Sequence, residues 1–529
     1  MQPPKAGAEI TTFEDVVAYL STPGVVGPGR PAIHQTHIAF VFVGGGRALK
    51  IKRPVKLGYL DFSTLAARHA ACLSEIRVNR DNAPEIYRGT VAITREANGT
   101  LAIGGPGVPV EWAVEMAAFE DDDLLSRRAR QGPLEPLAMR QTADAIHAMH
   151  QRSQRAVAVD APAKMQAIID EVGENSQQHP HVLDQREVEQ FMTAAKAANA
   201  AAANLLQARV REGAFRRCHG DLHLANIVSL NGRPTRFEAL ECSDEMAPGD
   251  TLYDLAFLLM DLIHHRQRAA ANEVLNRYLW RGGGTSGATE DVEALALMPL
   301  YLACRAGIRA MVGATRATMV ESKGDEYRAV VDDARRYLDE AIVALAPATP
   351  RLIAIGGLSG SGKSTLAARL APLVGGPYGA LHIRSDLERK AMMGVEETDR
   401  LPAGDYTPQT AQLVYERVLV RAAAGLAAGQ CVIVDAVFAT PGERVRAGEA
   451  ASRLGVPFDG LWLEADREIL HARVAGRHGD ASDATREVVE RQLHYTLGAL
   501  DWQRIDAAGP PERTLTRTLC ALRLVARKD

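Results

Sequence analysis

The chain has little of what a nucleic-acid-binding protein needs. Its 61 lysines and arginines are outnumbered by 65 aspartates and glutamates, the net charge is -4, and aromatic residues make up only 5%. A surface for polynucleotides depends on positive charge that follows the phosphates and on aromatic side chains that stack on bases. The composition therefore argues against nucleic acid as a partner.

Cysteine clusters and long apolar runs are also lacking. The six cysteines are scattered, without a CxxC pair or a Cys/His cluster, which is typical of reduced, buried thiols. The N-terminus, MQPPKAGAEI, has no signal-peptide layout. No apolar run reaches the ~18 residues of a membrane span, and the longest, 255–263, contains Asp261 and is predicted to be a core helix. We therefore expect a cytoplasmic protein without a membrane partner, and nothing in the sequence indicates an oligomeric state.

The first part of the chain mixes strand and helix patterns. Its β-rich, alternating segments predict strands at 36–56, around a glycine turn, and at 86–94, 100–105 and 108–116. Apolar residues at helical spacing predict helices at 63–82, 134–210 and most of 250–346. Two further short strands, IVSL at 227–230 and TRFEAL at 235–240, are predicted around Asn231-Gly232.

The second part alternates strands with helices. Strands are predicted at 352–357, 380–384, 431–436, 459–464 and 503–507. Such alternation implies a parallel sheet that helices cover on both faces. The prolines of ALAPATP at 344–350 mark the linker, so the predicted domains are 1–346 and 347–529.

The clearest motif is GLSGSGKS at 357–364, a P-loop (Walker A) pattern between a predicted strand and a predicted helix. Its glycines let backbone N–H groups turn toward phosphate oxygens, and the following helix presents its positive end to the same anion. In such a loop Lys363 reaches the terminal phosphates of ATP and Ser364 offers a hydroxyl to Mg²⁺. The residues expected to bind the nucleotide are Gly357, Ser359, Gly360, Ser361, Gly362, Lys363, Ser364 and Thr365.

Two further segments carry candidate groups for this site. Asp435 ends the apolar strand of VIVDAVF, where it is placed to hold Mg²⁺, with a helix N-cap as the alternative. Arg473 and Arg477 are four residues apart and share a helix face. Such a pair can clamp a γ-phosphate, with a solvated basic face as the alternative.

Together, GLSGSGKS, IRSD at 383–386, VIVDAVF and the DASDA segment at 480–484 resemble the P-loop small-molecule kinases, the gluconate, shikimate and nucleotide kinases. The resemblance covers about 352–525 and implies an α/β fold with a five-stranded parallel sheet and a lid. It also implies that Asp386 contacts the acceptor and that Arg389 holds a phosphate or carboxylate of it. A helix cap by Ser385 or Asp386 is the alternative.

The second strong motif is CHGDLHLAN at 218–226. His219-Gly220-Asp221, with Asn226 five residues later, resembles the catalytic loop of protein kinases and of aminoglycoside phosphotransferases. The resemblance implies that Asp221 accepts or orients the proton of the acceptor hydroxyl and that Asn226 binds Mg²⁺. YDLAFLLMDL at 253–262 matches the helix in which Asp254 would brace this loop, with a helix N-cap as the alternative for Asp254. A turn rich in Asp and Asn for conformational reasons is the alternative.

RALKIKRPV at 47–55 offers the phosphate-binding lysine of this domain. Lys50 and Lys52 alternate along a predicted strand and point to one face; Lys50 fits the expected A-x-K form and Lys52 is the reserve. Glu75, on the next predicted helix, either pairs with that lysine or faces solvent. VPVEWAVEMAAF at 108–119 resembles the strand that enters the interlobe hinge, where backbone groups from Glu115 to Ala117 would meet adenine.

The metal-binding acid of the first domain departs from the pattern. The related enzymes carry an aspartate on the strand after the catalytic loop, whereas this segment reads RFEALECSDE at 236–245. Counting from Asn226 favours Glu238, counting back from Asp254 favours Glu241, and Asp244 is a third candidate. Either glutamate keeps the charge but adds a methylene, which shifts the metal.

Taken together, these motifs and the segment 57–89 resemble bacterial bifunctional aminoglycoside phosphotransferase/ATP-binding proteins over nearly the whole chain. The resemblance implies two domains: an α+β, bilobal, protein-kinase-like domain, with a small lobe at about 1–117 and a helical large lobe at about 118–346, and the α/β P-loop domain. Each would transfer the γ-phosphoryl of Mg-ATP to a small hydroxylated acceptor. The alternative is a nucleotide-driven switch in which one domain gates the other. The acidic run at 120–123 is either a solvated face or a site for a polycationic acceptor.

Overall fold

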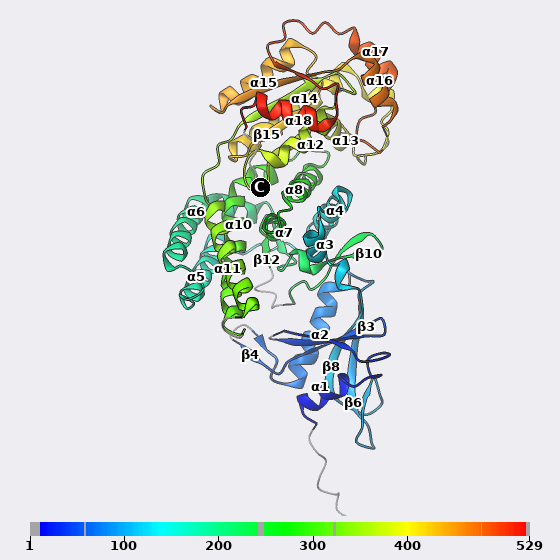
Figure 1. Cartoon of the computed structure of the whole chain (residues 1–529), viewed down its shortest axis with the longest axis vertical. Coiled ribbons are helices and arrows are strands. Elements are labelled where there is room, and N and C mark those ends of the chain that lie inside the picture. Colours follow the sequence, from blue (N-terminus) through cyan, green and yellow to red (C-terminus); the bar gives the residue numbers. More distant parts are fainter. Residues whose placement is uncertain are drawn as a thin grey trace, which may run out of the picture. The chain divides into compact units, whose positions relative to one another are not determined.

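The computed structural model describes residues 11–524, apart from 37, 58–59, 242–247, 321–323 and 478. It divides into two compact units, whose helices and strands are labelled in Figure 1. Unit 1 comprises Met1–Gly132, Ser153–Arg155 and Arg216–Gly249, and unit 2 comprises Pro133–Arg152, Ala156–Phe215 and Asp250–Asp529. The domain boundary predicted near residue 346 stays a prediction.

Unit 1 is built on an antiparallel sheet of six strands in the order β1-β2-β3-β8-β6-β7. The strands are β1 (Ala32–Gln35), β2 (Ala39–Gly44), β3 (Arg47–Lys52), β6 (Tyr87–Arg95), β7 (Leu101–Ile103) and β8 (Val108–Ala117). The predicted turn between β2 and β3 is present, and Gly45 and Gly46 adopt positive φ there. The sequence patterns missed β1 and the helix α1 (Phe13–Leu20).

One helix packs on each face of this sheet. Val16 and Leu20 of α1 join the core formed by Leu49 and Ile51 of β3. On the other face, α2 (Leu65–Asn79) contributes Cys72 to a second core. Because side chains alternate along a strand, Lys50 and Lys52 of β3 point toward the α2 face, as predicted.

The rest of unit 1 consists of short helices and strands. After β3 come β4 (Lys56–Leu57) and β5 (Leu60–Asp61), and after β8 come η1 (Asp121–Asp123) and α3 (Leu125–Gln131). Later in the chain, η2 (Leu224–Asn226) leads into the antiparallel hairpin of β10 (Ile227–Leu230) and β11 (Arg233–Arg236). The predicted strand 235–240 is therefore wrong beyond Arg236, because Glu238 turns the backbone to positive φ. β9 (Phe215–Arg217) and β12 (Pro248–Asp250) cross the sequence boundaries of the units.

Unit 2 contains a helical region. Its elements are α4 (Pro136–Arg152), α5 (Ala161–Gln177), α6 (Gln185–Arg211), α7 (Thr251–His264), α8 (Arg268–Gly283), α9 (Glu290–Glu293), η3 (Ala294–Leu297), α10 (Met298–Ala317) and α11 (Asp325–Ala344). α7 is buried along almost its whole length, which confirms the predicted core helix. Within the described residues, Glu290–Ala317 is long and apolar enough to cross a membrane, but 67% of its apolar window is buried inside the protein, as in a core helix.

The second part of unit 2 is a parallel sheet in the order β14-β15-β13-β16-β17, which confirms the predicted five strands. The strands are β13 (Leu352–Gly357), β14 (Leu381–Arg384), β15 (Val432–Asp435), β16 (Phe458–Glu464) and β17 (Gln503–Asp506). The helices are α12 (Lys363–Leu370), η4 (Ala371–Leu373), α13 (Ser385–Met392), η5 (Ala403–Asp405), α14 (Pro408–Ala427), α15 (Pro441–Arg453), α16 (Arg467–Ala475), α17 (Arg486–Leu493) and α18 (Pro511–Ala521).

The cysteines match the predicted reduced state. Cys72, Cys218, Cys304 and Cys431 are buried and unbridged, whereas Cys520 is exposed, because its position on α18 faces solvent. Cys242 lies outside the described residues.

Asp250 is expected to be important for the stability of unit 2. It caps α7 through the N–H of Leu252 (2.8 Å), accepts two hydrogen bonds from buried Arg209 (3.0 Å each) and one from Tyr301 (3.0 Å). Asp250→Ala leaves the Arg209 charge in the core with one remaining carboxylate partner, and we expect a loss of about 3–5 kcal/mol in the free energy of unfolding.

Asp291→Ala is the matched control for urea unfolding, because Asp291 contacts the same guanidinium (2.8 Å) from a more exposed position. We expect it to cost about 1 kcal/mol or less. Equal losses for the two variants would contradict the role assigned to Asp250.

Candidate active sites

The loop between β13 and α12 has the shape of a phosphate cradle. Gly360 and Gly362 adopt φ of +86° and +95°, and a Cβ on Gly360 would lie 2.6 Å from the Leu470 carbonyl oxygen. Only glycine fits such a position. The buried hydroxyl of Ser361 has no hydrogen-bond partner among the described residues. A buried donor of this kind, at the N-terminus of a helix, suits an anionic ligand.

Ser364 and Asp435 lie together beside this loop. β15 pairs with β13, so that Asp435 lies opposite Ile355 near the end of β13. The Ser364 hydroxyl donates to Asp435 Oδ1 (3.2 Å). Burial alone would raise the pKa of Asp435, but His382 and the nearby cations hold it below its ordinary value. A charged carboxylate next to a hydroxyl fits Mg²⁺, which prefers oxygen ligands.

Asp386 is the buried acid on the acceptor side. It lies in the first turn of α13, immediately beyond β14. Burial raises its pKa, with Arg384 opposing the effect and Asp435 reinforcing it. Burial also lowers the pKa of the Lys363 ammonium, which donates to the Leu358 carbonyl oxygen (3.0 Å). Groups with shifted pKa values in a cleft are typical of sites that transfer protons or bind charged ligands.

These groups line one cavity of about 990 Å³. Of the predicted residues of this domain, Gly357 is outside the lining and those inside it are Ser359, Gly360, Ser361, Gly362, Lys363, Ser364, Thr365, Asp386, Arg389, Asp435, Arg473 and Arg477. A cavity of this size fits a nucleotide and a small second molecule.

The two predicted arginines differ in their contacts. Arg473 donates to carbonyl oxygens of the phosphate loop at Gly360 (3.5 Å) and Ser361 (3.4 Å), and to those of Ala507 (2.8 Å) and Gly509 (2.9 Å). It therefore ties α16 to the loop rather than lying on a solvated face. Arg477 lies 3.5 Å from Asp480 on the cavity wall.

Three further side chains contact this site: His382 and Gln492 carried no sequence signal, and Arg384 belongs to the IRSD segment but was given no role from the sequence. His382 contacts Asp435 Oδ2 (2.9 Å), Arg384 pairs with Asp480 (2.8 Å), and the Gln492 amide oxygen accepts from the Ser359 N–H (2.7 Å). They come from β14 and α17, far from the P-loop in sequence. An isolated His or Gln forms no motif, so only their placement identifies His382 and Gln492.

In unit 1, Glu75 lies between the two lysines of β3. Its carboxylate contacts Lys50 Nζ (3.0 Å) through one oxygen and Lys52 Nζ (2.6 Å) through the other, and its side chain is fully buried. Burial would raise the pKa of Glu75, but the two lysines hold it at about 2. Of the two alternatives for Glu75, the structure shows the paired one.

The two candidate metal acids each bind one lysine. Glu238 contacts Lys50 Nζ (2.9 Å), and Glu241 forms a short contact with Lys52 Nζ. Burial opposes the charge of Lys50, but Glu238 and Glu75 hold its pKa well above the ordinary value. Burial raises the pKa of Glu241, and Glu75 adds to the rise. Asp244 lies outside the described residues.

The loop of Asp221 and Asn226 is closed by its own side chains. Asn226 Nδ2 donates to both the carbonyl oxygen and Oδ2 of Asp221 (2.9 Å each). The Phe237 N–H donates to the Asn226 carbonyl oxygen (3.0 Å), so Glu238 follows directly on the residue that is bound to this loop. Glu238 has φ of +59°, a conformation that non-glycine residues hold only when the surroundings enforce it.

Hydrogen bonds hold the segment after β11 in this conformation. The Tyr87 hydroxyl accepts from the Glu238 N–H (3.1 Å), and Asn79 accepts from the Ala239 N–H (2.7 Å). His219, from the HGD motif, contacts the Phe237 carbonyl oxygen (3.0 Å). These contacts hold Glu238 directly after Phe237, the residue that is bonded to the Asn226 carbonyl group.

The predicted hinge residues lie inside the sheet. Glu115 pairs with Leu49 of β3 and Gly89 of β6, and the Ala117 N–H donates to the Ile86 carbonyl oxygen (2.8 Å). Strand pairing thus occupies these backbone groups. The backbone leaves the sheet only after Ala117, at 118–120.

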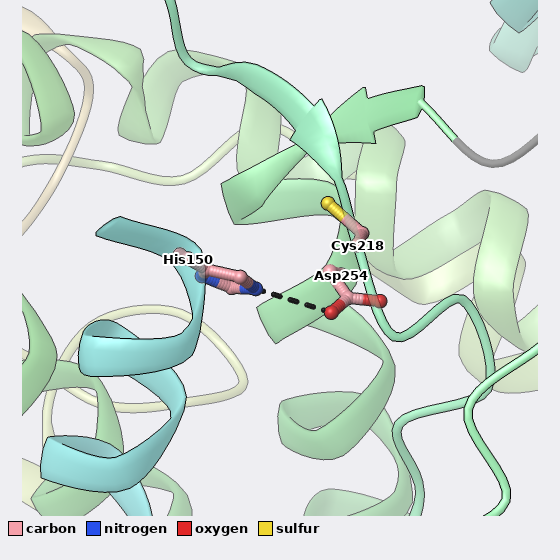
Figure 2. Close-up of side chains that lie close together, drawn as sticks. All are labelled: His150, Cys218 and Asp254. Carbon is pink, nitrogen blue, oxygen red and sulfur yellow. Dashed lines mark hydrogen bonds and ion pairs between the residues drawn. The ribbon is translucent and has the colours of Figure 1, made fainter. Parts of the chain in front are cut away.

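Two further predicted features are Asp254 and the acidic run at 120–123. Asp254 begins α7 within unit 2, and its Oδ2 lies 3.1 Å from Nε2 of His150 on α4, the dashed contact in Figure 2. The run at 120–123 overlaps η1, and Asp123 pairs with Arg128 (2.7 Å) at the surface.

Comparisons with known proteins match two parts of the chain to two families. Residues 97–290 match the family described as "Phosphotransferase enzyme family", and residues 352–496 match the family described as "AAA domain". An uncharacterized protein of Mycobacterium tuberculosis is 31% identical over 503 residues, which is 91% of this chain and 93% of the relative. An uncharacterized protein of Mycobacterium bovis matches equally well.

Two solved structures overlap with parts of the chain. A sugar kinase from Janibacter sp. HTCC2649 is 23% identical and covers 34% of this chain and 96% of its own, with a TM-score of 0.25. A choline/ethanolamine kinase family protein from Mesorhizobium loti is 16% identical and covers 63% of this chain and 98% of its own, with a TM-score of 0.35. Because the mycobacterial relatives align over nearly their whole length, this chain belongs to their family of two-domain bacterial proteins, in which an aminoglycoside phosphotransferase-like domain is fused to a P-loop kinase-like domain.

Proposed function

We propose that the P-loop domain transfers the γ-phosphoryl group of ATP to a hydroxyl group of a small molecule. One observation carries the proposal: a single cavity holds the phosphate loop, the Ser364–Asp435 pair and the buried Asp386. A cradle for the donor, a place for Mg²⁺ and an acid for the acceptor are the parts that phosphoryl transfer requires.

The chemistry assigned to each group follows from its position. Mg²⁺, when bound by Ser364 and Asp435, supplies positive charge next to the transferring phosphoryl group. Lys363 and the N–H groups of the loop bind the phosphates and stabilise negative charge in the transition state. Asp386 accepts the proton of the acceptor hydroxyl. The oxygen of that hydroxyl bonds to the γ-phosphorus while the bond between this phosphorus and the β–γ bridging oxygen breaks. ADP and a phosphate monoester are the products.

We propose the same reaction class for the phosphotransferase-like domain, with a different acceptor. Asp221 is the group that meets the acceptor hydroxyl, Asn226 and Glu238 hold Mg²⁺, and Lys50 binds the phosphates. Pairing with Glu75 keeps Lys50 charged and oriented. Adenine is expected to meet the backbone at 119–120, beyond Ala118, whose N–H donates to the Gly46 carbonyl oxygen, and beyond Glu115 and Ala117, whose groups are paired in the sheet. We further propose that the two domains comprise residues 1–346 and 347–529. The proposed location is the cytoplasm, where ATP is available.

A nucleotide-driven switch is the second candidate function, and one observation favours it. Both lysines of β3 contact a glutamate beyond the catalytic loop, Lys50 through Glu238 and Lys52 through Glu241. These carboxylates compete with phosphate for the same ammonium groups. In this alternative, the phosphotransferase-like domain binds nucleotide to gate the P-loop domain and transfers nothing.

Single substitutions separate the two functions. We expect Lys363→Ala and Asp221→Ala each to remove one phosphorylated product when the purified protein is given labelled ATP and a metabolite pool. Lys196→Ala, an exposed lysine that pairs with Asp170, is the control and should keep both products. If Lys363→Ala removed all turnover while Asp221→Ala removed none, the switch would be favoured.

Protonation of Asp386 is expected to set the acidic limb of the pH profile of turnover in the P-loop domain. A base works only when deprotonated, and burial places its pKa above the ordinary carboxyl value, so turnover should fall as the pH drops through that raised pKa. The measurement is ATP turnover against pH in an Asp221→Ala background. Asp386→Asn should lower turnover and remove the limb; an unchanged limb in this variant would exclude Asp386 as the base.

Glu238 and Glu241 are expected to differ in function. Glu238→Ala should lower the Mg²⁺-dependent turnover of the phosphotransferase-like domain by about 10–100-fold, the effect typical of groups that hold or orient a metal. Glu241→Ala removes a partner of buried Lys52 and should mainly lower the melting temperature. Turnover is measured in a Lys363→Ala background, and the opposite pattern would assign the metal to Glu241.

A further inference from the structure

Helix α8 is bound to the edge of the parallel sheet by side-chain hydrogen bonds. β14 is an edge strand, and among the described strands none pairs with its outer N–H and C=O groups. Asn276 of α8 accepts from the His382 N–H (2.7 Å) and donates to the Ala380 carbonyl oxygen (3.2 Å), as a paired strand would. Asn272, one turn earlier, donates to the Tyr378 (2.9 Å) and Ala380 (2.8 Å) carbonyl oxygens. The helix thus closes this edge of the sheet.

The same helix holds the segment that follows β14. The Trp280 indole N–H donates to the Leu387 carbonyl oxygen (3.0 Å) in α13, the helix that carries Asp386. Arg277 stacks over the Trp280 ring (4.5 Å), and its Nη1 donates to Glu397 Oε2 (2.8 Å). α8 therefore contacts the chain before, within and after the part that supplies the acceptor-side acid.

Arg277 is held in one orientation by a second partner. Its Nε and Nη2 bind both oxygens of Asp144 on α4 (2.6 and 2.8 Å), a bidentate pair. The Arg277 side chain is 9% exposed and the Glu397 side chain 19% exposed, so solvent screens this pair only weakly. A planar guanidinium bound on two sides fixes the position of the carboxylate on the third.

Glu397 also faces Arg384, a cation next to the candidate site. Its second oxygen lies 3.9 Å from Arg384 Nη1. Arg384 in turn contacts Asp480 (2.8 Å) on the cavity wall and lies 3.8 Å from Asp435, the candidate metal ligand. A continuous line of charged contacts therefore runs from Asp144 through Arg277, Glu397 and Arg384 to the cavity.

We propose that Arg277 is a positioning residue of the P-loop site, acting through Glu397 on Arg384 and on the adjoining Asp386. The inference rests on the proposed function of that site. It makes a helix of the phosphotransferase-like domain a working part of the P-loop domain, although the two belong to different matched families. Loss of the Arg277–Glu397 contact lets Arg384 and the start of α13 shift, while the phosphate loop, which α8 does not hold, keeps its shape.

The test compares Arg277→Gln and Glu397→Gln with Arg281→Gln in the full chain carrying Asp221→Ala. Arg281 is a matched control: it lies one turn further along α8, contacts the same Asp144 (2.8 Å) and pairs with the neighbouring Glu396 (2.8 Å). Glu396 is 59% exposed and no ion pair between it and Arg384 occurs among the described residues, so the Arg281 pair should contribute little.

In these variants we expect turnover to fall while the affinity for nucleotide stays nearly unchanged. In Arg277→Gln and Glu397→Gln, the kcat of Mg-ATP hydrolysis should fall about tenfold, since small displacements of reacting groups cost this much or more. The affinity for a non-hydrolysable ATP analogue, measured by calorimetry, should remain within about twofold. The double variant should lose no more than either single one, because both act through the same contact.

Hydrogen exchange tests the positioning role of Arg277 independently of turnover. Backbone amides at 384–397 should exchange at least about tenfold faster in Arg277→Gln than in the wild type, and those of the phosphate loop should not change. Wild-type exchange at 384–397 in Arg277→Gln, or equal losses in Arg277→Gln and Arg281→Gln, overturns the inference. ATP hydrolysis that Lys363→Ala leaves unchanged instead rejects the proposed function, which separates the two failures.

Discussion

In a parallel sheet, the carboxyl ends of all strands meet at one edge, and the candidate P-loop site depends on this geometry. β13 leads into the phosphate loop, β15 ends at Asp435 and β14 ends two residues before Asp386. Because β15 lies between β14 and β13, groups from segments about 30 to 80 residues apart in the chain become neighbours. The same strand order leaves β14 at the edge, where its outer backbone groups need partners from outside the sheet.

Burial of charge is the cost of gathering these groups, and both units offset it by pairing. In the P-loop domain, His382 and Arg384 face Asp435, and Arg384 also contacts Asp480. In unit 1, Glu75 contacts Lys50 and Lys52 at once, and each lysine has a second carboxylate partner. Burial opposes the charge of Lys50, but Glu238 and Glu75 hold the pKa of this lysine above its ordinary value, as binding of a polyanion requires.

Helix α8 gives the two families in this chain a shared structural element. Its Asn276, Arg277 and Trp280 contact the P-loop domain, while the adjacent Tyr278 bonds His150 (2.9 Å), the residue that contacts Asp254 at the start of α7. Figure 2 shows the His150–Asp254 contact. The fusion therefore involves side-chain contacts throughout unit 2 and is more than a covalent connection at the predicted linker.

The sequence by itself determined the local features: the phosphate loop, the HGD loop with Asn226, the alternation that places Lys50 and Lys52 on one face, and the five strands of the parallel sheet. Each depends on residues close together in the chain, whose spacing sets the backbone conformation directly. Only the tertiary structure decided that Phe237, directly before Glu238, binds Asn226, that Glu115 and Ala117 are occupied by strand pairing, and that Arg473 binds loop carbonyl groups. It also brought Arg277 to Glu397, 120 residues away. Contacts over such separations depend on how elements pack, and neighbouring residues in the sequence carry no record of that packing.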